Sequence, residues 1–246
     1  MCTAILSIEP GAPVLLAGVR DELADRAWQP PGRHWPDYPG LIGGLDLVAR
    51  GTWLAVSPAQ RRVACVLNGR GRMAPAGTRR SRGVLPLRAA ASGTLPRAGL
   101  ADFDPFHLLT AEPGTATLRS WDGARLTERK LTAGLHVVVN SGLSSESAPE
   151  RARVAHFLPK FRAAARPVPG PGSPVRSAWG AWLPLINGDG IPPDDPRALI
   201  VRRDLGDGRV WGTTSISLVS LSPEALRYDF TAAPGEPTAW YPVTGG

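Results

Sequence analysis

The chain opens with the stretch Met1-Cys-Thr-Ala-Ile-Leu-Ser-Ile-Glu-Pro-Gly-Ala-Pro-Val-Leu-Leu-Ala-Gly-Val-Arg-Asp-Glu22. The apolar run Thr3–Ile8 is typical of a β-strand. Two prolines and a glycine in Glu9–Pro13 predict a turn, and Val14–Gly18 is then a second strand. The sequence therefore predicts that the chain begins with a β-hairpin, on which the remaining strands are assembled.

This hairpin would return Arg20 and Asp21 to the neighbourhood of Cys2. Removal of Met1 would leave Cys2 with a thiol and a free α-amine on one residue. An α-amine has an ordinary pKa of roughly 7.7–8, so it can accept the thiol proton and return it to a leaving group. Cysteine is also a common small, buried, apolar residue. Two interpretations of Cys2 thus stay open, a nucleophile and an inert core residue.

Composition favours one globular domain that spans residues 1–246. Of the 246 residues, 43% are hydrophobic and 20% are charged, a balance that supplies material for a core. Residues 167–174 are rich in proline and glycine and are expected to be an internal linker. The sequence contains no run of eighteen apolar residues, so it predicts no membrane-spanning helix. The N-terminus also lacks a signal-peptide pattern, and we therefore expect a cytoplasmic protein.

The net charge of +7 comes almost entirely from arginine, since only Lys130 and Lys160 are lysines. Such usage is typical of a GC-rich, bacterial-type coding bias. The densest basic cluster lies in a loop within residues 70–82, and no aromatic residue follows before residue 97 to stack on a base. We therefore expect no nucleic-acid partner. A solvated loop is the first interpretation of this cluster, and a site for an anionic ligand is the second.

The rest of the chain predicts mainly antiparallel strands and few helices, an α+β fold. One helix is expected at residues 150–166, kinked or divided by Pro159, and a helix start is expected at Asp104-Pro105. The loop from Leu23 to Pro36 should be ordered but irregular. Further strands are predicted at residues 51–56, 61–67, 115–121, 124–131, 134–142, 198–203, 210–221 and 225–231.

With Val19-Arg20-Asp21-Glu22, the chain resembles the NRDE family, the group that contains transport and Golgi organisation protein 2. The family's Asn-Arg-Asp-Glu motif appears here with Val19 in place of asparagine. Leu45 and Thr214 stand where the family usually has arginine, which implies an altered anion site. Other family features recur in order: Arg26 with the Pro/Trp loop that follows it to Trp35, Gly43-Gly44-Leu45-Asp46, Gly51-Thr52-Trp53-Leu54, Val66-Leu67-Asn68, Ser81-Arg82-Gly83, residues 104–109, residues 134–140 and Gly212-Thr213.

This family in turn resembles the N-terminal-nucleophile hydrolases, especially the choloylglycine-hydrolase and penicillin-V-acylase branch, which also begin Met-Cys. The resemblance implies an αββα sandwich of two antiparallel sheets, with Cys2 at the start of a central strand. It also implies catalytic roles for Arg20 and Asp21, and an oxyanion-hole role for Asn140. Neighbours on a regular strand point to opposite faces, so Arg20 and Asp21 can both reach Cys2 only across a bulge or turn. A catalytic Cys2 is expected to be more ionised at neutral pH than an ordinary cysteine.

Two functions from different classes remain open. One is an N-terminal-cysteine hydrolase or acyltransferase that acts on amide or acyl bonds. The other, which the resemblance implies, is a non-catalytic protein that binds and moves haem, an acyl lipid or acyl-coenzyme A. No cofactor is required, and haem could be held only reversibly, because no Cys-x-x-Cys-His motif is present. The four histidines have no metal-ligand spacing. The candidate substrate-binding residues are Trp28, Trp35, Trp53 and Asn68.

Overall fold

The N-terminal hairpin forms as predicted and lies in the middle of a sheet. The structure, a computed structural model, describes residues 2–95, 97–143 and 148–244. Strands β1 (Thr3–Ile8) and β2 (Val14–Leu23) pair antiparallel, with Thr3 opposite Val19. β2 is longer than predicted because it pairs along its whole length with β12 (Val210–Leu221) on its other side.

The hairpin belongs to the first of two antiparallel sheets. Its main path runs β10-β1-β2-β12-β13-β14, and β11 pairs with β12 beside this path. The remaining strands of this sheet are β10 (Gly134–Val138), β11 (Arg202–Asp204), β13 (Leu226–Thr231) and β14 (Tyr241–Pro242). β10 ends at Val138, so it is shorter than the strand predicted over residues 134–142, and as an edge strand it is only partly buried.

The second sheet follows the order of the chain, from β3 to β9, because each strand is joined to its neighbour by an antiparallel connection. Strands that follow one another in the chain are often neighbours in a sheet, and here this holds even across the long connection of residues 69–105. Its strands are β3 (Trp28–Gly32), β4 (Ile42–Asp46), β5 (Leu54–Ser57), β6 (Arg62–Asn68), β7 (Phe106–Glu112), β8 (Thr115–Trp121) and β9 (Leu126–Leu131).

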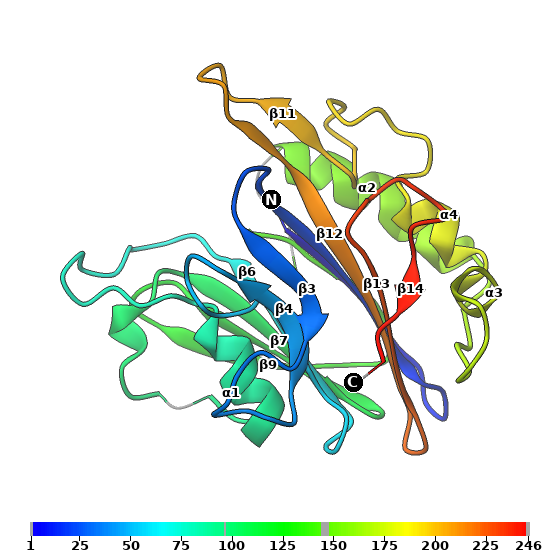
Figure 1. The fold of residues 1–246 in the computed structure, drawn as a ribbon, viewed down its shortest axis with the longest axis horizontal. Coiled ribbons are helices and arrows are strands. Elements are labelled where there is room, and N and C mark those ends of the chain that lie inside the picture. The colour runs from blue at the N-terminus through cyan, green and yellow to red at the C-terminus, as the bar shows by residue number, and fades with distance from the viewer. Residues whose placement is uncertain (1, 96, 144–147, 245–246) are drawn as a thin grey trace.

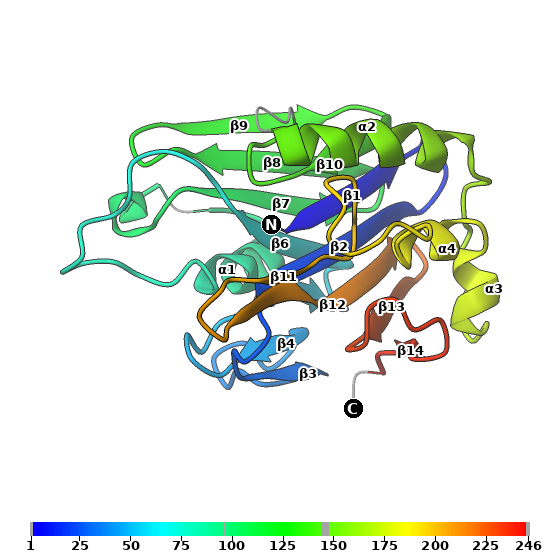
Figure 2. The ribbon, with the colours of Figure 1, turned by 90° about the horizontal axis from the view of Figure 1, so that it is seen from above.

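The two sheets pack face to face, and helices cover their outer faces (Figures 1 and 2). Alternation along β1 sends Ala4 and Leu6 into the core between the sheets and Ile5 toward the helices. The α+β sandwich expected from the sequence is therefore confirmed. The helical segments are α1 (Val84–Ser92) over the second sheet, α2 (Ala148–Ala163), α3 (Val175–Trp179) and α4 (Trp182–Ile186) over the first, and a short 3-10 turn, η1 (Leu100–Asp102).

Two local predictions were wrong at prolines. Residues 28–32 form β3 rather than an irregular loop, because an edge strand with a register shift between Gln29 and Gly32 tolerates prolines. Asp104-Pro105 does not begin a helix. The Asp104 carboxylate instead accepts a hydrogen bond from the Ala74 N–H, and the chain continues into β7 between β6 and β8.

Helix α2 is one element that continues through Pro159, so it is not divided there. Pro159 and Ala155, the residue four positions earlier, both lie on the exposed side of the helix. Water can therefore bind the Ala155 carbonyl that the proline leaves without an N–H partner. In the part of the chain that the structure describes, no helix has both the length and the apolar character needed to span a membrane.

A buried ion pair joins the first sheet to its helical layer. Asp229 on β13 is fully buried and accepts hydrogen bonds from Trp179 Nε1 at 2.7 Å and from Arg227 Nε at 2.6 Å. Arg227 also donates to the carbonyls of Gly170 and Ser173. This cluster therefore fixes α3 and the irregular connection over residues 167–174 against the sheet.

Asp229→Ala is expected to lower the free energy of unfolding by about 3–5 kcal/mol, because Arg227 would stay buried without its carboxylate partner. Urea denaturation measures this change, provided that the m value is unaltered. Asp207→Ala is the matched control, since it removes an exposed carboxylate that pairs with Arg209. The control should leave stability unchanged within error, and equal losses in both variants would contradict the assignment.

Candidate functional site

Cys2 and Arg20 share one face of the hairpin. The register that pairs Thr3 with Val19 and Ala4 with Gly18 places Cys2 opposite Arg20 when it is continued by one residue. Residues directly opposite in an antiparallel pair project to the same side, here the space between the two sheets. The Cys2 thiol is partly buried and donates to the Asp21 backbone carbonyl at 3.7 Å.

The Asp21 carboxylate lies on the other face, toward the helices. Thr213 Oγ1 donates to Asp21 Oδ1 at 2.7 Å, and Arg153 Nη1 from α2 lies 3.8 Å from Oδ2. Arg153 Nη1 also donates to Thr3 Oγ1 at 2.8 Å. β2 has no bulge at this point. The bulge lies in β12 between Thr213 and Ser215, and the Cys2 thiol binds the backbone carbonyl of Asp21.

The ionisation of Cys2 differs from the expectation for an activated nucleophile. Burial raises the pKa of the Cys2 thiol, and the Asp21 carboxylate raises it further, while the Arg20 charge acts in the opposite direction. Burial and the Asp21 carboxylate thus oppose the excess of thiolate that is expected of an activated nucleophile. With a raised pKa, attack by the Cys2 sulfur requires a base that removes the thiol proton during the reaction.

Arg20 is held by contacts within the protein. Its Nη1 donates to Thr214 Oγ1 at 2.9 Å, and its Nη2 lies 3.6 Å from an Asp46 carboxylate oxygen. Its guanidinium also stacks over the ring of Trp53, 4.3 Å from the centroid. Thr214, which stands where the family resemblance implies an arginine, thus serves here as a hydrogen-bond acceptor for Arg20.

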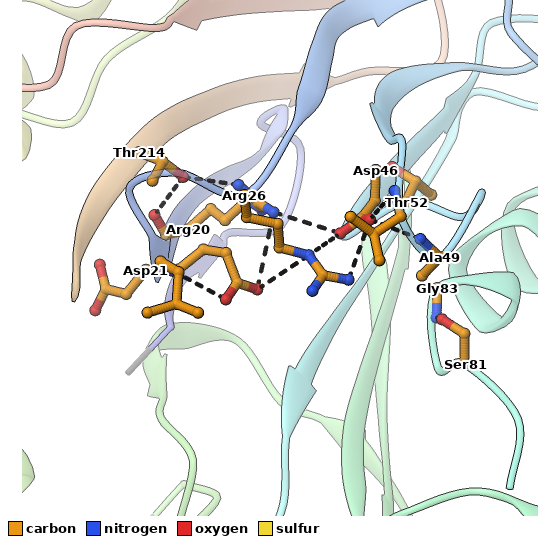
Figure 3. A network of polar contacts seen from close by, with 12 residues as sticks. Arg20, Asp21, Arg26, Asp46, Ala49, Thr52, Ser81, Gly83 and Thr214 are labelled. Atoms are coloured by element: carbon orange, nitrogen blue, oxygen red, sulfur yellow. Dashed lines mark hydrogen bonds and ion pairs between the residues drawn. The ribbon is translucent and has the colours of Figure 1, made fainter. Parts of the chain in front are cut away.

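Asp46 is the centre of the polar network drawn in Figure 3. Arg26 binds its carboxylate in a bidentate manner, at 2.6 and 3.1 Å, and the N–H groups of Val48 and Ala49 donate to the same group. Burial opposes ionisation of Asp46, but the bonds from Arg26 and Ala49 outweigh it and hold the pKa of this carboxyl below its ordinary value. The loop after β4 is fixed beside Arg20 as a result.

Cys2 and Arg20 open into a cleft of about 560 Å³ between the β4–β5 turn and the loop that precedes α1. The two walls approach closely at Gly51 and Gly83, where the Thr52 N–H donates to the Gly83 carbonyl at 2.9 Å. A Cβ at Gly51 would lie only 2.7 Å from the Gly83 Cα, so the contact requires glycine. The basic loop therefore does more than extend into solvent, and its cleft-lining arginines are Arg79, Arg80 and Arg82.

The two candidate asparagines lie in different places. Asn68, at the end of β6, lines the Cys2 cleft and also a second cavity of about 310 Å³. Asn140 lines the second cavity with Arg153, but it does not line the cleft. The Asn140 carbonyl accepts a hydrogen bond from His107 Nε2 at 3.1 Å, whereas its buried side-chain oxygen has no hydrogen-bond partner among the described residues.

The structure separates the three candidate tryptophans. Trp53 lines the cleft. Trp28 packs its ring edgewise on Trp53, with centroids 5.6 Å apart, and supports it from behind. Trp35 is buried in the cluster beneath α1 and donates to the Arg50 carbonyl, and it does not line the cleft.

Several residues of the site were not singled out as site residues from the sequence. Arg26 and Asp46 fall within recognised family features, so their pairing carried a detectable signal. Arg153 and Thr213 gave none, because only the packing of α2 and the pairing of β12 bring them to Asp21. Within the residues that the structure describes, no group of three or more His, Cys, Asp or Glu side chains is arranged to hold a metal ion.

A comparison with family models finds one described as Transport and Golgi organisation 2, which matches residues 1–166. The matched range contains Cys2, Arg20, Asp46 and the basic loop, and it ends before Thr213 and Thr214. A search of curated proteins finds no match to the chain.

A limiting dose of iodoacetamide should alkylate Cys2 well before Cys65. Burial raises the pKa of the Cys65 thiol to about 12, and its side chain is enclosed between the sheets. Because the pKa of Cys2 is also raised, its alkylation rate should still increase above pH 8.5, where an ordinary cysteine is already half ionised. Peptide mass mapping from pH 6 to 10 measures both rates, and faster labelling of Cys65 would contradict the placement of Cys2.

Proposed function

The chain belongs to the Transport and Golgi organisation 2 family, and from this premise we propose that it is an N-terminal-cysteine hydrolase acting on an amide or acyl bond. The observation that carries the proposal is the position of Cys2, at the entry of a central strand and in the wall of a cleft that contains Arg20 and Asn68. A buried, inert cysteine would not line such a cleft. Cys65 provides that contrast within the same chain.

In the proposed reaction the Cys2 sulfur attacks the carbonyl carbon of the substrate. The thiol proton passes to the α-amine of Cys2, which then protonates the leaving group as the carbon–heteroatom bond breaks. Water hydrolyses the resulting thioester and regenerates the thiol. The raised pKa of Cys2 fits a thiol that is deprotonated only during attack. This mechanism requires removal of Met1, a residue that lies outside the described part of the chain.

The surrounding residues take roles that follow from their positions. Asn68 lines the cleft, so its amide is the better placed of the two asparagines to donate to the oxyanion, and Asn140 can act only on a group that reaches the second cavity. The positive charge of Arg20 favours the thiolate as it forms. Asp21, held by Thr213 and Arg153, is assigned to orient the α-amine.

A second candidate function is a carrier that binds a hydrophobic anion such as haem or acyl-coenzyme A without converting it. The raised pKa of Cys2 favours this reading as well, because the resting thiol is a poor nucleophile. Among the described residues no histidine lines the cleft that could ligate haem iron, whereas arginines for carboxylates are present. Any haem would therefore be held through its carboxylates by the cleft arginines and through its ring by Trp53.

Cys2→Ser is expected to abolish turnover of amide or thioester substrates while it leaves ligand binding largely intact. The matched control is Cys65→Ser, which removes the buried thiol and should retain turnover. Intact-mass measurement of the native protein accompanies these assays. Full retention of Met1, or unchanged turnover in Cys2→Ser, would exclude the proposed mechanism.

Titration with haem and with acyl-coenzyme A tests the carrier function. Saturable quenching of tryptophan fluorescence is expected for a ligand that enters the cleft, since Trp53 forms part of its wall. An unrelated protein with a similar arginine content serves as the control for nonspecific attraction. Quenching that does not saturate with either ligand would leave the carrier function without support.

A further inference from the structure

Arginines and carboxylates line the Cys2 cleft together, but they are not evenly paired. Arg26 is bound to Asp46, Arg20 is bound to Thr214 and lies near Asp46, and Arg79 Nε lies 3.1 Å from an Asp104 oxygen. Each of these three cations is already compensated by contacts within the protein. Each of them has a carboxylate within ion-pair distance.

Arg82 is different. Its guanidinium is half-buried and makes one side-chain hydrogen bond among the described residues, from Nη1 to the Pro105 carbonyl at 2.9 Å. A guanidinium has five N–H donors, so most of them remain available on the cleft side. No carboxylate lies within ion-pair distance of Arg82 among the described residues.

Arg80 extends the same wall. Its guanidinium rests on the ring of Phe103, 5.4 Å from the centroid, and makes no ion pair with a described carboxylate. The neighbouring backbone is fixed by the Arg80 N–H, which donates to the Asp102 carbonyl at 2.7 Å. Arg80 is exposed and Arg82 is half-buried, and no described carboxylate neutralises either charge, so both guanidiniums can receive an anion that enters the cleft.

Burial and nearby charges explain why Arg82 would bind an anion. Burial lowers the pKa of Arg82, and the charges of Asp104, Cys2 and Glu22 oppose this change, so its environment is one in which a negative group stabilises the cation. A guanidinium that is partly removed from water and has no carboxylate partner binds an oxyanion more strongly than an exposed one does.

We propose that Arg80 and Arg82 form a subsite for an oxyanion, a carboxylate or phosphate group, carried by the molecule that binds beside Cys2. The inference rests on the proposed function and deepens it, because it limits the substrate to acyl or amide compounds with a negatively charged group. Composition allowed two interpretations of the basic loop within residues 70–82, a solvated segment and an anion site. The proposal selects the anion site.

Alkylation of Cys2 tests this subsite without any need for turnover. Iodoacetate carries a carboxylate and iodoacetamide does not, so the ratio of their rates with the folded full-length protein reports an anion site beside the thiol. The rate of Cys2 alkylation should saturate with iodoacetate concentration at low salt. Inorganic phosphate or acetate should protect Cys2 from this reagent. Arg82→Gln should lower the iodoacetate rate about tenfold more than it lowers the iodoacetamide rate, a difference equivalent to one strong charge-assisted bond.

Controls separate the subsite from general charge and from folding. Arg176→Gln removes an exposed arginine on α3, on the opposite side of the first sheet, and should change neither rate. Arg80→Gln should lower the iodoacetate rate even if Arg82→Gln fails to fold, and circular dichroism verifies the fold of each variant. Stronger protection by phosphate would indicate a phosphate-bearing substrate, and stronger protection by acetate a carboxylate.

Equal effects of Arg82→Gln on both reagents, or no protection by either anion, would overturn the subsite. Failure of the hydrolase proposal gives a different pattern. In that case no substrate turns over, but the selectivity for iodoacetate and its loss in Arg82→Gln persist. The anion subsite would then belong to a carrier.

Discussion

The pairing register of the N-terminal hairpin is the constraint on which the site depends. Because side chains alternate along a strand, a shift of one residue would move Cys2 from the space between the sheets to the helical face. The observed register puts Cys2 and Arg20 on one side and Asp21 with Thr3 on the other. Pairing of β2 with β12 along its full length fixes this register.

Each face of the hairpin then has its own electrostatic environment. Toward the second sheet, Arg20 is held by Thr214, Asp46 and the ring of Trp53. Toward the helices, Asp21 is held by Thr213 and Arg153. Cys2 lies between these two sets, where burial raises the pKa of its thiol and the thiol lines the cleft. The same geometry suits a nucleophile with its own base and a site that only binds.

The glycine motifs and the basic loop act together in building the cleft. Gly51 and Gly83 allow the loop before α1 to touch the β4–β5 turn, and this contact brings Arg82 into the wall opposite the hairpin. The β4–β5 turn is itself fixed by the bidentate ion pair between Arg26 and Asp46. The close backbone contact places Arg80 and Arg82 in one wall of the cleft, and the carboxylates of the cleft pair with other arginines. The charges of Arg80 and Arg82 are therefore left uncompensated.

The sequence by itself determined the hairpin, most of the other strands and the return of Asp21 to Cys2, because turn residues and apolar runs act locally. The strand predicted over residues 198–203 was wrong for residues 198–201, since β11 begins at Arg202. It also predicted the family and the sandwich from motifs that the matched range contains. Only the tertiary structure decided that residues 28–32 and 106–112 are strands, that Asn68 rather than Asn140 shares the cleft with Cys2, and that Trp35 belongs to the core. It also decided the partners of Asp21, since Arg153 and Thr213 lie more than a hundred residues away in the chain. Such contacts depend on how helices and sheets pack, which no local pattern of residues specifies.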